Sequence, residues 1–225
     1  MNTMFDTLLQ LPLFQGLSQE DFTNILAKVK LDFTKHKANE ILAKAGTPCN
    51  RLVFILKGQG TFCTSYTDVS YTVSECFAAP YVIEPHSLFG LSTDYVATYH
   101  ATDEVHAVTL SKQALLDELF NYEICRLNYM NIISHRAQAM QRRFWSMAPL
   151  PTEKRIAHFI LTHVERPIGE KSVKIKMEVL AQLINETRMT VSRALNNMQS
   201  KELLELHRGE IVVPEAALLA ELLED

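Results

Sequence analysis

The chain is poor in the residues from which many metal, redox and phosphate sites are built. Its four cysteines are widely spaced and form no CxxC pair, which argues against a structural zinc site or a redox pair. It has only seven glycines and no glycine-rich loop of the kind that cradles phosphates. These cysteines are Cys49, Cys63, Cys76 and Cys125.

The chain also lacks a long apolar run and a strong charge of one sign. No segment is apolar over a length that would span a membrane, and the N-terminus has no basic stretch followed by an apolar one, as a secretory signal would. We therefore expect a cytoplasmic protein without a membrane partner. Because 26 acidic residues stand against 22 basic ones, for a net charge of −4, any field that attracts DNA must be local.

No catalytic motif is recognisable. A Gly-x-Ser-x-Gly signature and a Ser/His/Asp arrangement are both absent. His86, His100 and His106 lack the clustered spacing that a cupin-like metal oxygenase needs. We therefore predict no catalytic and no metal-ligating residue. A cupin-like metal enzyme stays as the less favoured alternative, which a stoichiometric bound metal would support.

What is present begins with a capped helix and a β-rich segment. Ser18 with Asp21 resembles a capping box before a helix. A short helix over Ser87–Leu91, capped by Ser87, is also predicted. Short runs rich in β-forming residues indicate an antiparallel barrel or roll: Leu52–Leu56, Thr61–Tyr66, Tyr71–Phe77, Tyr81–Ile83 and Val105–Leu110.

After residue 111 the pattern becomes helical. We predict a short helix over Ala114–Phe120 and a long one from about Tyr122 to Met147. Apolar residues recur along the long helix at a spacing that suits a coiled-coil seam, through which two copies of the chain would dimerise. A helix packed on its own barrel is the alternative, although that needs a wider apolar stripe. The apolar residues recur at steps of three or four: Leu127, Met130, Ile133, Ala137, Met140, Phe144 and Met147.

The most informative segment, Leu180–Met198, predicts two amphipathic helices joined by a tight turn. It follows Pro149 and Pro151, which break the long helix, and a helix predicted over Glu153–Val164. Asn185 tolerates the left-handed conformation that such a turn needs. Thr187 can cap the second helix.

The second helix divides into two faces. At about 100° per residue, one face is apolar and packs on a core. The other carries two guanidinium groups and a hydroxyl near the helix N-terminus, which is the face that a helix-turn-helix protein places in the DNA major groove. The apolar face holds Val191, Ala194, Leu195 and Met198, and the polar face holds Arg188, Met189, Ser192, Arg193 and Asn196.

The residues that follow predict a wing. Leu206-His207 and Glu210–Val213 read as a two-stranded hairpin with Gly209 at the turn, and Val173–Ile175 offers a partner strand. Between residues 171 and 208, seven basic residues stand against four acidic ones, which gives a modest local excess of the sign that DNA requires.

Taken together, the chain resembles bacterial Crp/Fnr-type transcription regulators over nearly its whole length. The resemblance rests on Pro12–Ser18, Leu52–Gly60, Pro151–Ile160 and above all Leu180–Met198. It implies an α+β protein with an N-terminal antiparallel β-roll of the double-stranded β-helix or jelly-roll type, a long dimerisation helix and a C-terminal winged helix-turn-helix. The implied domains are 1–121, 122–148 and 149–225.

The resemblance also implies the partners and the residues that contact DNA. The partners are double-stranded DNA, a second copy of the chain, RNA polymerase and a small-molecule effector that the sequence does not identify. Arg188 and Arg193 would read bases or nearby phosphates, while Ser192 and Met189 would tune the choice. Met189 stands where the family usually has Glu, so we expect a different half-site. Thr187, Thr190 and Arg208 would contact the DNA backbone.

The roll departs from the cyclic-nucleotide members of the family. These members hold the ribose with a Gly-Glu pair and the phosphate with an Arg-Ser pair. Here the stretch Glu84–Leu91 has no Gly-Glu, and the arginine position falls near Tyr95-Val96. No arginine occurs between Arg51 and Arg126, so a buried cyclic phosphate would lack a charged partner. Cyclic AMP is therefore disfavoured as the effector.

Other effectors remain open. Aromatic residues and histidines predict an apolar effector pocket, although aromatic side chains also fill the core of a small barrel. Haem ligation by His86, His100 or Cys76 is an alternative sensor function, whereas the absence of cysteine before Cys49 disfavours an iron–sulfur cluster. The predicted pocket residues are His86, Ser87, Phe89, Tyr95, Tyr99 and His100.

Overall fold

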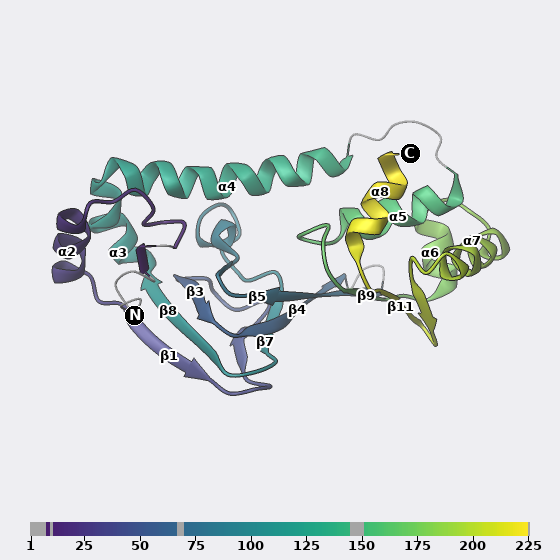
Figure 1. Cartoon of the computed structure of the whole chain (residues 1–225), viewed down its shortest axis with the longest axis horizontal. Helices are drawn as coiled ribbons and strands as arrows, with labels where there is room; N and C mark the ends of the chain where they lie inside the picture. Colours follow the sequence, from purple (N-terminus) through teal and green to yellow (C-terminus); the bar gives the residue numbers. More distant parts are fainter. Residues whose placement is uncertain (1–7, 10, 67–69, 145–150, 225) are drawn as a thin grey trace. The chain divides into compact units, whose positions relative to one another are not determined.

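The computed structural model describes residues 8–9, 11–66, 70–144 and 151–224 and shows two compact units (Figure 1). The first comprises Met1–Gly60 and Phe77–Ala139, and the second comprises Thr61–Cys76 and Met140–Asp225. The tip of one hairpin of the roll is thus grouped with the C-terminal half. The three domains expected from the sequence stay a prediction.

The first unit contains most of the roll and the helices next to it. Its helices are α2 (Gln19–Lys28), the 3₁₀ turn η2 (Pro85–Leu88), α3 (Lys112–Asp117), the 3₁₀ turn η3 (Leu119–Asn121) and α4 (Glu123–Phe144). Its strands are β1 (Asp32–His36), β2 (Ile41–Ala43), β3 (Arg51–Lys57), β6 (Tyr81–Ile83), β7 (Thr98–Ala101) and β8 (Val105–Ser111). The first two residues of β4 (Gln59–Tyr66) and the last two of β5 (Tyr71–Ala78) also belong to this unit.

The predicted antiparallel roll is confirmed. One sheet has the strand order β1-β8-β3-β6, and β2 pairs antiparallel with β7. All five predicted strands are present. The core beneath them is aromatic, with the Phe14 ring 5.2 Å from Phe22 and 6.2 Å from Phe54.

Three short strands, β1, β2 and β7, were not predicted. Four of the five residues of β1 are exposed, so the strand does not alternate between apolar and polar residues. Strands β2 and β7 have three and four residues, which is too short for a clear period. Their conformation comes from pairing with β8 and with each other, a tertiary effect that overrides local propensity.

Ser18 caps the start of α2, as predicted, although the Asp21 carboxylate bonds to the Ser18 hydroxyl and not to the Ser18 N–H of a full capping box. The Ser18 hydroxyl accepts a hydrogen bond from the Asp21 N–H at 3.0 Å and donates one to the Asp21 carboxylate at 2.8 Å. Phe22 and Ile25 of this helix are buried.

The predicted helix over Ser87–Leu91 is wrong. The structure has η2 instead, which begins at Pro85 with Glu84 at its N-terminal cap position. Strand β6 ends at Ile83, as expected before Pro85, but Pro85 also starts the turn, because proline suits the first turn of a helix. Ser87 caps nothing, because it lies within η2 and its hydroxyl donates to the Glu84 carboxylate at 2.7 Å.

Helix α4 has one buried and one exposed apolar face. Cys125 and Tyr129 are buried, while Leu127 and Met130 are 44% and 53% exposed. Ala137 is also exposed and Ile133 is half-buried. The side chains of Met140 and Phe144, like residue Met147, lie outside the described part of the chain. None of the described helices is long and apolar enough to cross a membrane.

The second unit is a winged helix joined by the hairpin of β4 and β5 (Figure 1). Strand β9 pairs with β11, and β11 with β10, all antiparallel. Strand β5 pairs with the other edge of β9, from Thr72↔Lys174 to Glu75↔Lys171. Its elements are α5 (Thr152–Thr162), β9 (Lys171–Lys174), α6 (Met177–Leu183), α7 (Arg188–Ser200), β10 (Glu205–His207), β11 (Glu210–Val213) and α8 (Ala216–Glu224).

A buried ion pair accompanies this strand pairing. The Lys171 ammonium lies 2.9 Å from Oε2 of Glu75, and the two side chains are 2% and 3% exposed. Glu75 also accepts hydrogen bonds from the N–H groups of Glu165 and Arg166. Burial raises the pKa of Glu75, while Lys171 and the N–H groups act in the opposite direction.

Aromatic side chains of the hairpin pack around His163. Its ring lies 5.3 Å from both Tyr66 and Tyr71 and 4.6 Å from Phe159. Nδ1 lies 2.7 Å from the Phe159 carbonyl oxygen. Burial lowers the pKa of His163 from its usual 6.5, because the apolar surroundings disfavour the imidazolium.

We expect the second unit to lose stability as the pH falls below about 6.5. The unfolded chain binds a proton at His163 in this range while the folded chain resists it, so each pH unit costs up to about 1.4 kcal/mol until the folded-state pKa is passed. Thermal unfolding at pH 7.5 and 5.5 measures this loss. His163→Gln should reduce the loss, whereas His207→Asn, which removes an exposed histidine of the wing, should leave it unchanged. Equal pH dependence in all three proteins would contradict the assignment.

Candidate nucleic-acid interface

The turn between α6 and α7 has the predicted geometry. Asn185 has a φ of 52°, in the left-handed region, and the Glu186 N–H donates to the Ala181 carbonyl at 2.8 Å. The Thr187 side chain accepts from the Thr190 N–H at 3.2 Å and caps α7. These contacts fix where α7 begins.

Arg155 of α5 contacts the same turn, a role that was not predicted from the sequence. Its Nη1 donates to the Glu186 carboxylate at 2.8 Å, and its Nη2 donates to the Ile184 carbonyl. The signal in the sequence was faint, because a single arginine on an amphipathic helix normally faces solvent. Arg155 positions the turn and so the start of α7.

Helix α5 is also tied to the far end of α7. Oε2 of Glu153 lies 2.9 Å from the Lys201 ammonium, and Asn197 donates to Oε1. The hydrogen bond from Lys201 holds the pKa of Glu153 below its usual value. Helix α7 is thus fixed at both ends.

Helix α7 itself has the two predicted faces. Val191, Ala194, Leu195 and Met198 are buried. On the opposite face Arg188, Met189, Arg193 and Asn196 are exposed and Ser192 is half-buried. Met189 is 65% exposed, so its side chain is accessible on the polar face of α7.

The polar face is organised by weak surface contacts. Arg188 lies 3.1 Å from Oε1 of Glu178, and both side chains are more than half exposed, so this pair contributes little stability. Nη2 of Arg193 lies 3.6 Å from the Met189 sulfur. Both guanidinium groups can therefore turn to another partner at small cost.

The wing carries Arg208 at its tip. Gly209 has a φ of 77° in the turn between β10 and β11, and Arg208 beside it is exposed. Lys171, however, does not belong to the basic surface expected from the sequence. It is buried against Glu75, which reduces the seven basic residues of this segment to six accessible ones.

The six residues predicted for an effector pocket lie on or next to η2, on β7 and in the segment between these two elements. Tyr99 is in the core of the roll, with its ring 5.9 Å from Phe77. His100 is half-buried on β7. Three more of the six lie on or next to η2. Nδ1 of His86 lies 3.2 Å from Arg136 of α4, the Ser87 hydroxyl donates to Glu84, and the Phe89 ring lies 5.7 Å from the Tyr129 ring.

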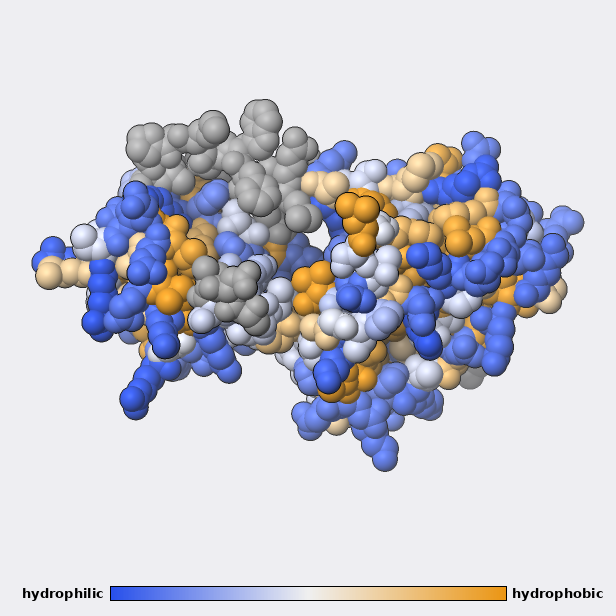
Figure 2. Space-filling model, turned by 180° about the vertical axis from the view of Figure 1, so that it is seen from behind, coloured by the Kyte–Doolittle hydropathy of each residue, from blue (hydrophilic) through white to orange (hydrophobic). Residues whose placement is uncertain are grey.

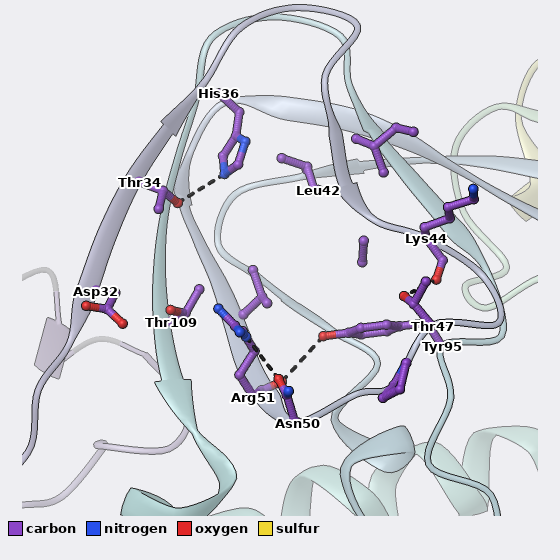
Figure 3. Close-up of a pocket in the computed structure, with 14 residues that line it drawn as sticks. Asp32, Thr34, His36, Leu42, Lys44, Thr47, Asn50, Arg51, Tyr95 and Thr109 are labelled. Atoms are coloured by element: carbon purple, nitrogen blue, oxygen red, sulfur yellow. Dashed lines mark hydrogen bonds between the residues drawn. The ribbon is translucent and has the colours of Figure 1, made fainter.

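Tyr95, the sixth, lines an open groove of about 610 Å³ (Figure 3). Strands β1, β2 and β3 form its walls. Its lining mixes apolar and polar side chains, and the charged ones include Lys44, Arg51 and Asp32. The hydroxyl of Tyr95 donates to the Arg51 carbonyl at 3.5 Å. Burial raises the pKa of Tyr95, so this hydroxyl keeps its proton at neutral pH.

The described residues offer little to a metal or a haem. Among them, no group of three or more His, Cys, Asp or Glu side chains is placed to hold a metal ion. The histidine of the groove, His36, has Nε2 at 3.0 Å from Thr34 and Nδ1 at 3.4 Å from Glu40. Of the predicted haem ligands, Cys76 belongs to the second unit, and His86 and His100 belong to the first.

Hydrophilic residues cover most of the face shown in Figure 2, and hydrophobic ones are exposed in small groups. Polarity alone therefore does not set the exposed face of α7 apart from the rest of the surface. What sets it apart is that two arginines lie on one side of a helix whose opposite side is buried.

Comparison with known protein families finds one match, in the C-terminal part of the chain. Residues 154–222 match the Crp-like helix-turn-helix domain. No curated protein matches the chain.

The chain is also similar to solved structures, of which one reaches a TM-score of 0.50. The c-di-GMP responsive global regulator CLP of Xanthomonas campestris is 16% identical with a TM-score of 0.50, over 88% of this chain and 99% of its own. The catabolite activator protein of Thermus thermophilus is 17% identical with a TM-score of 0.49, over 95% and 98%. DNR of Pseudomonas aeruginosa is 17% identical with a TM-score of 0.48, over 98% and 99%.

Proposed function

We propose that the protein is a sequence-specific transcription regulator that binds an inverted repeat as a homodimer. The proposal starts from the match of residues 154–222 to the Crp-like helix-turn-helix domain and from the likeness of the chain's fold to a solved regulator. The family match supports the resemblance inferred from the sequence over residues 154–222. One observation carries the proposal: α7 buries one face and presents Arg188, Ser192 and Arg193 on the other.

The chemistry of that face suits base reading in the major groove. An arginine can donate to both acceptors on a guanine edge, and a serine hydroxyl bonds either kind of group. Thr187, Thr190 and Arg208 lie at the start of α7 and at the wing tip, where a winged helix contacts phosphates. The direct test is the selection of binding sites from random duplex DNA by the full chain.

Met189 sets one position of the site apart. A glutamate there would accept a hydrogen bond from cytosine N4, whereas methionine offers only apolar contact, for example to a thymine methyl. We expect Met189→Glu to change the preferred base at one position of each half-site. The new carboxylate would also lie one turn before Arg193 and restrain it. Site selection with both proteins measures the change, and Met189→Gln separates charge from size. An unchanged preference would refute this role.

The exposed apolar face of α4 supports the homodimer. Leu127, Met130 and Ala137 lie at intervals of three and seven residues and are all exposed, while Tyr129 on the other side is buried. A 22-residue helix is about 33 Å long. Two such helices would cover these side chains in a coiled-coil seam.

We expect Met130→Asp to weaken dimerisation by on the order of 100-fold, since two carboxylates would be brought into one apolar seam and like charges in an interface cost several kcal/mol. Sedimentation velocity over a concentration series measures the dissociation constant. Asn131→Asp adds the same charge about 100° around the helix and should have a small effect. If M130D dimerises as tightly as N131D, α4 is not the dimer interface.

We also propose that cyclic AMP is not the effector. The position that the family resemblance gives to the phosphate-binding arginine holds Tyr95, which is buried and offers no positive charge. His86 and Phe89 lie against α4, and they, together with Ser87, Tyr95, Tyr99 and His100, remain the proposed effector-sensing residues.

A further inference from the structure

The Glu84 carboxylate is buried in the roll and held by neutral donors. The residue is 2% exposed. Its Oε2 accepts hydrogen bonds from the Ser87 hydroxyl at 2.7 Å and from the Val96 N–H at 2.8 Å, and its Oε1 accepts one from the Ala97 N–H at 2.8 Å. Hydrogen bonds to an ionised acceptor are roughly twice as strong as neutral ones.

These donors form an oxyanion site from two separate segments. The hydroxyl comes from η2, and the two N–H groups come from consecutive residues just before β7. Successive main-chain N–H groups that point at one spot form an anion-binding concavity. In this protein the anion is part of the chain itself.

The backbone conformation of Glu84 is also unusual for a glutamate. Glu84 has a φ of 32°, in the left-handed region, which favours glycine. A glutamate is strained there, and the three hydrogen bonds to its carboxylate are what compensate for the strain.

The segment that Glu84 holds is the one on which α4 rests. The carbonyl of the next residue, Pro85, accepts a hydrogen bond from the Tyr129 hydroxyl at 2.8 Å. The Phe89 ring lies 5.7 Å from Tyr129 and 6.3 Å from Phe120. The position of η2 and that of the middle of α4 are therefore coupled.

We propose that Glu84 is a built-in anionic ligand of the roll: its carboxylate fills an oxyanion site made by Ser87, Val96 and Ala97 and holds η2 in place against α4 without an external anion. Removing the side chain opens that site to a small carboxylate. Propionate is the natural probe, because it is the Glu84 side chain with one hydrogen added.

The test compares Glu84→Gly with Glu202→Gly in the full chain. Glu202 also has a positive φ, of 58°, but is exposed, so both variants place glycine at a left-handed position and only E84G empties the site. We expect E84G to melt at a lower temperature than E202G. Propionate at about ten times its dissociation constant should then raise the folding equilibrium constant of E84G about 11-fold. Propionamide and sodium chloride at equal concentration should not, nor should propionate affect E202G or the unchanged protein.

Two results would overturn the proposal: E84G as stable as E202G, or an E84G whose stability propionate does not raise. If E84G does not fold, Glu84→Gln gives the decision through amide hydrogen exchange. Its NH₂ group would face a main-chain N–H, so we expect faster exchange at Val96 and Ala97 with unchanged exchange in β8. Unchanged exchange at all of these sites would also overturn it. None of these measurements uses DNA, so their failure leaves the proposed function untouched.

Discussion

Replacing Arg188 by alanine should weaken binding to the selected DNA site by about 1–3 kcal/mol for each recognition helix. The arginine is more than half exposed and paired with Glu178 at the surface, so it is available to form bidentate bonds to a guanine, which the alanine variant would lose. Binding to random DNA should fall much less, and the preference at one base pair of each half-site should relax. Fluorescence anisotropy at one fixed salt concentration measures both affinities, because affinity for DNA depends strongly on salt.

Arg208→Ala is the matched control for this experiment. It removes the same charge from the wing tip, where Arg208 is exposed beside Gly209, and should weaken specific and random DNA alike, since phosphate contacts carry no sequence information. If R188A also weakens both by the same factor, Arg188 contacts phosphate and does not read a base.

Replacing Lys171 by methionine should lower the stability of the second unit by about 3–5 kcal/mol, because it leaves the Glu75 charge unpaired in the interior. The ammonium and the carboxylate lie 2.9 Å apart, and both side chains are almost fully buried. The double variant Glu75→Gln/Lys171→Met has no buried charge and should recover part of the loss. Amide exchange in β5 and β9 reports the opening free energy of this part of the unit.

Lys174→Met is the control within the same strand. Lys174 is exposed, and surface substitutions of this kind change stability by less than about 0.5 kcal/mol. A K171M protein as stable as K174M would show that the ion pair does not hold β5 to β9.

The sequence was sufficient for the DNA-binding face because that face is a local pattern. The periodicity of Val191, Ala194, Leu195 and Met198, the turn at Asn185 and the cap at Thr187 all lie within fourteen consecutive residues, and all three are confirmed. The wing is likewise local, since Gly209 joins β10 and β11 directly.

What the sequence could not show are contacts between distant segments. Lys171 looked like part of the basic surface, but its partner Glu75 lies 96 positions earlier. Arg155 reaches a turn 29 to 31 residues away. Glu84 meets N–H groups 12 and 13 residues further along, and nothing in the residues between them predicts that convergence.

The placement of η2 shows a different limit. A helix after this strand can begin behind a cap at Ser87 or at Pro85 itself, and a single sequence does not distinguish the two. The hydrogen bonds of Glu84 to Ser87, Val96 and Ala97 accompany the second outcome, and they are tertiary.

The measurement that tests the central claim most directly is the selection of binding sites from random duplex DNA by the full chain. We predict an inverted repeat whose half-sites are centred about 34 Å, or one helical turn, apart, because two copies of α7 would enter successive major grooves on one side of the duplex. Enrichment of a single unrepeated site, or no enrichment over random DNA, would contradict the account of a dimeric, sequence-specific regulator.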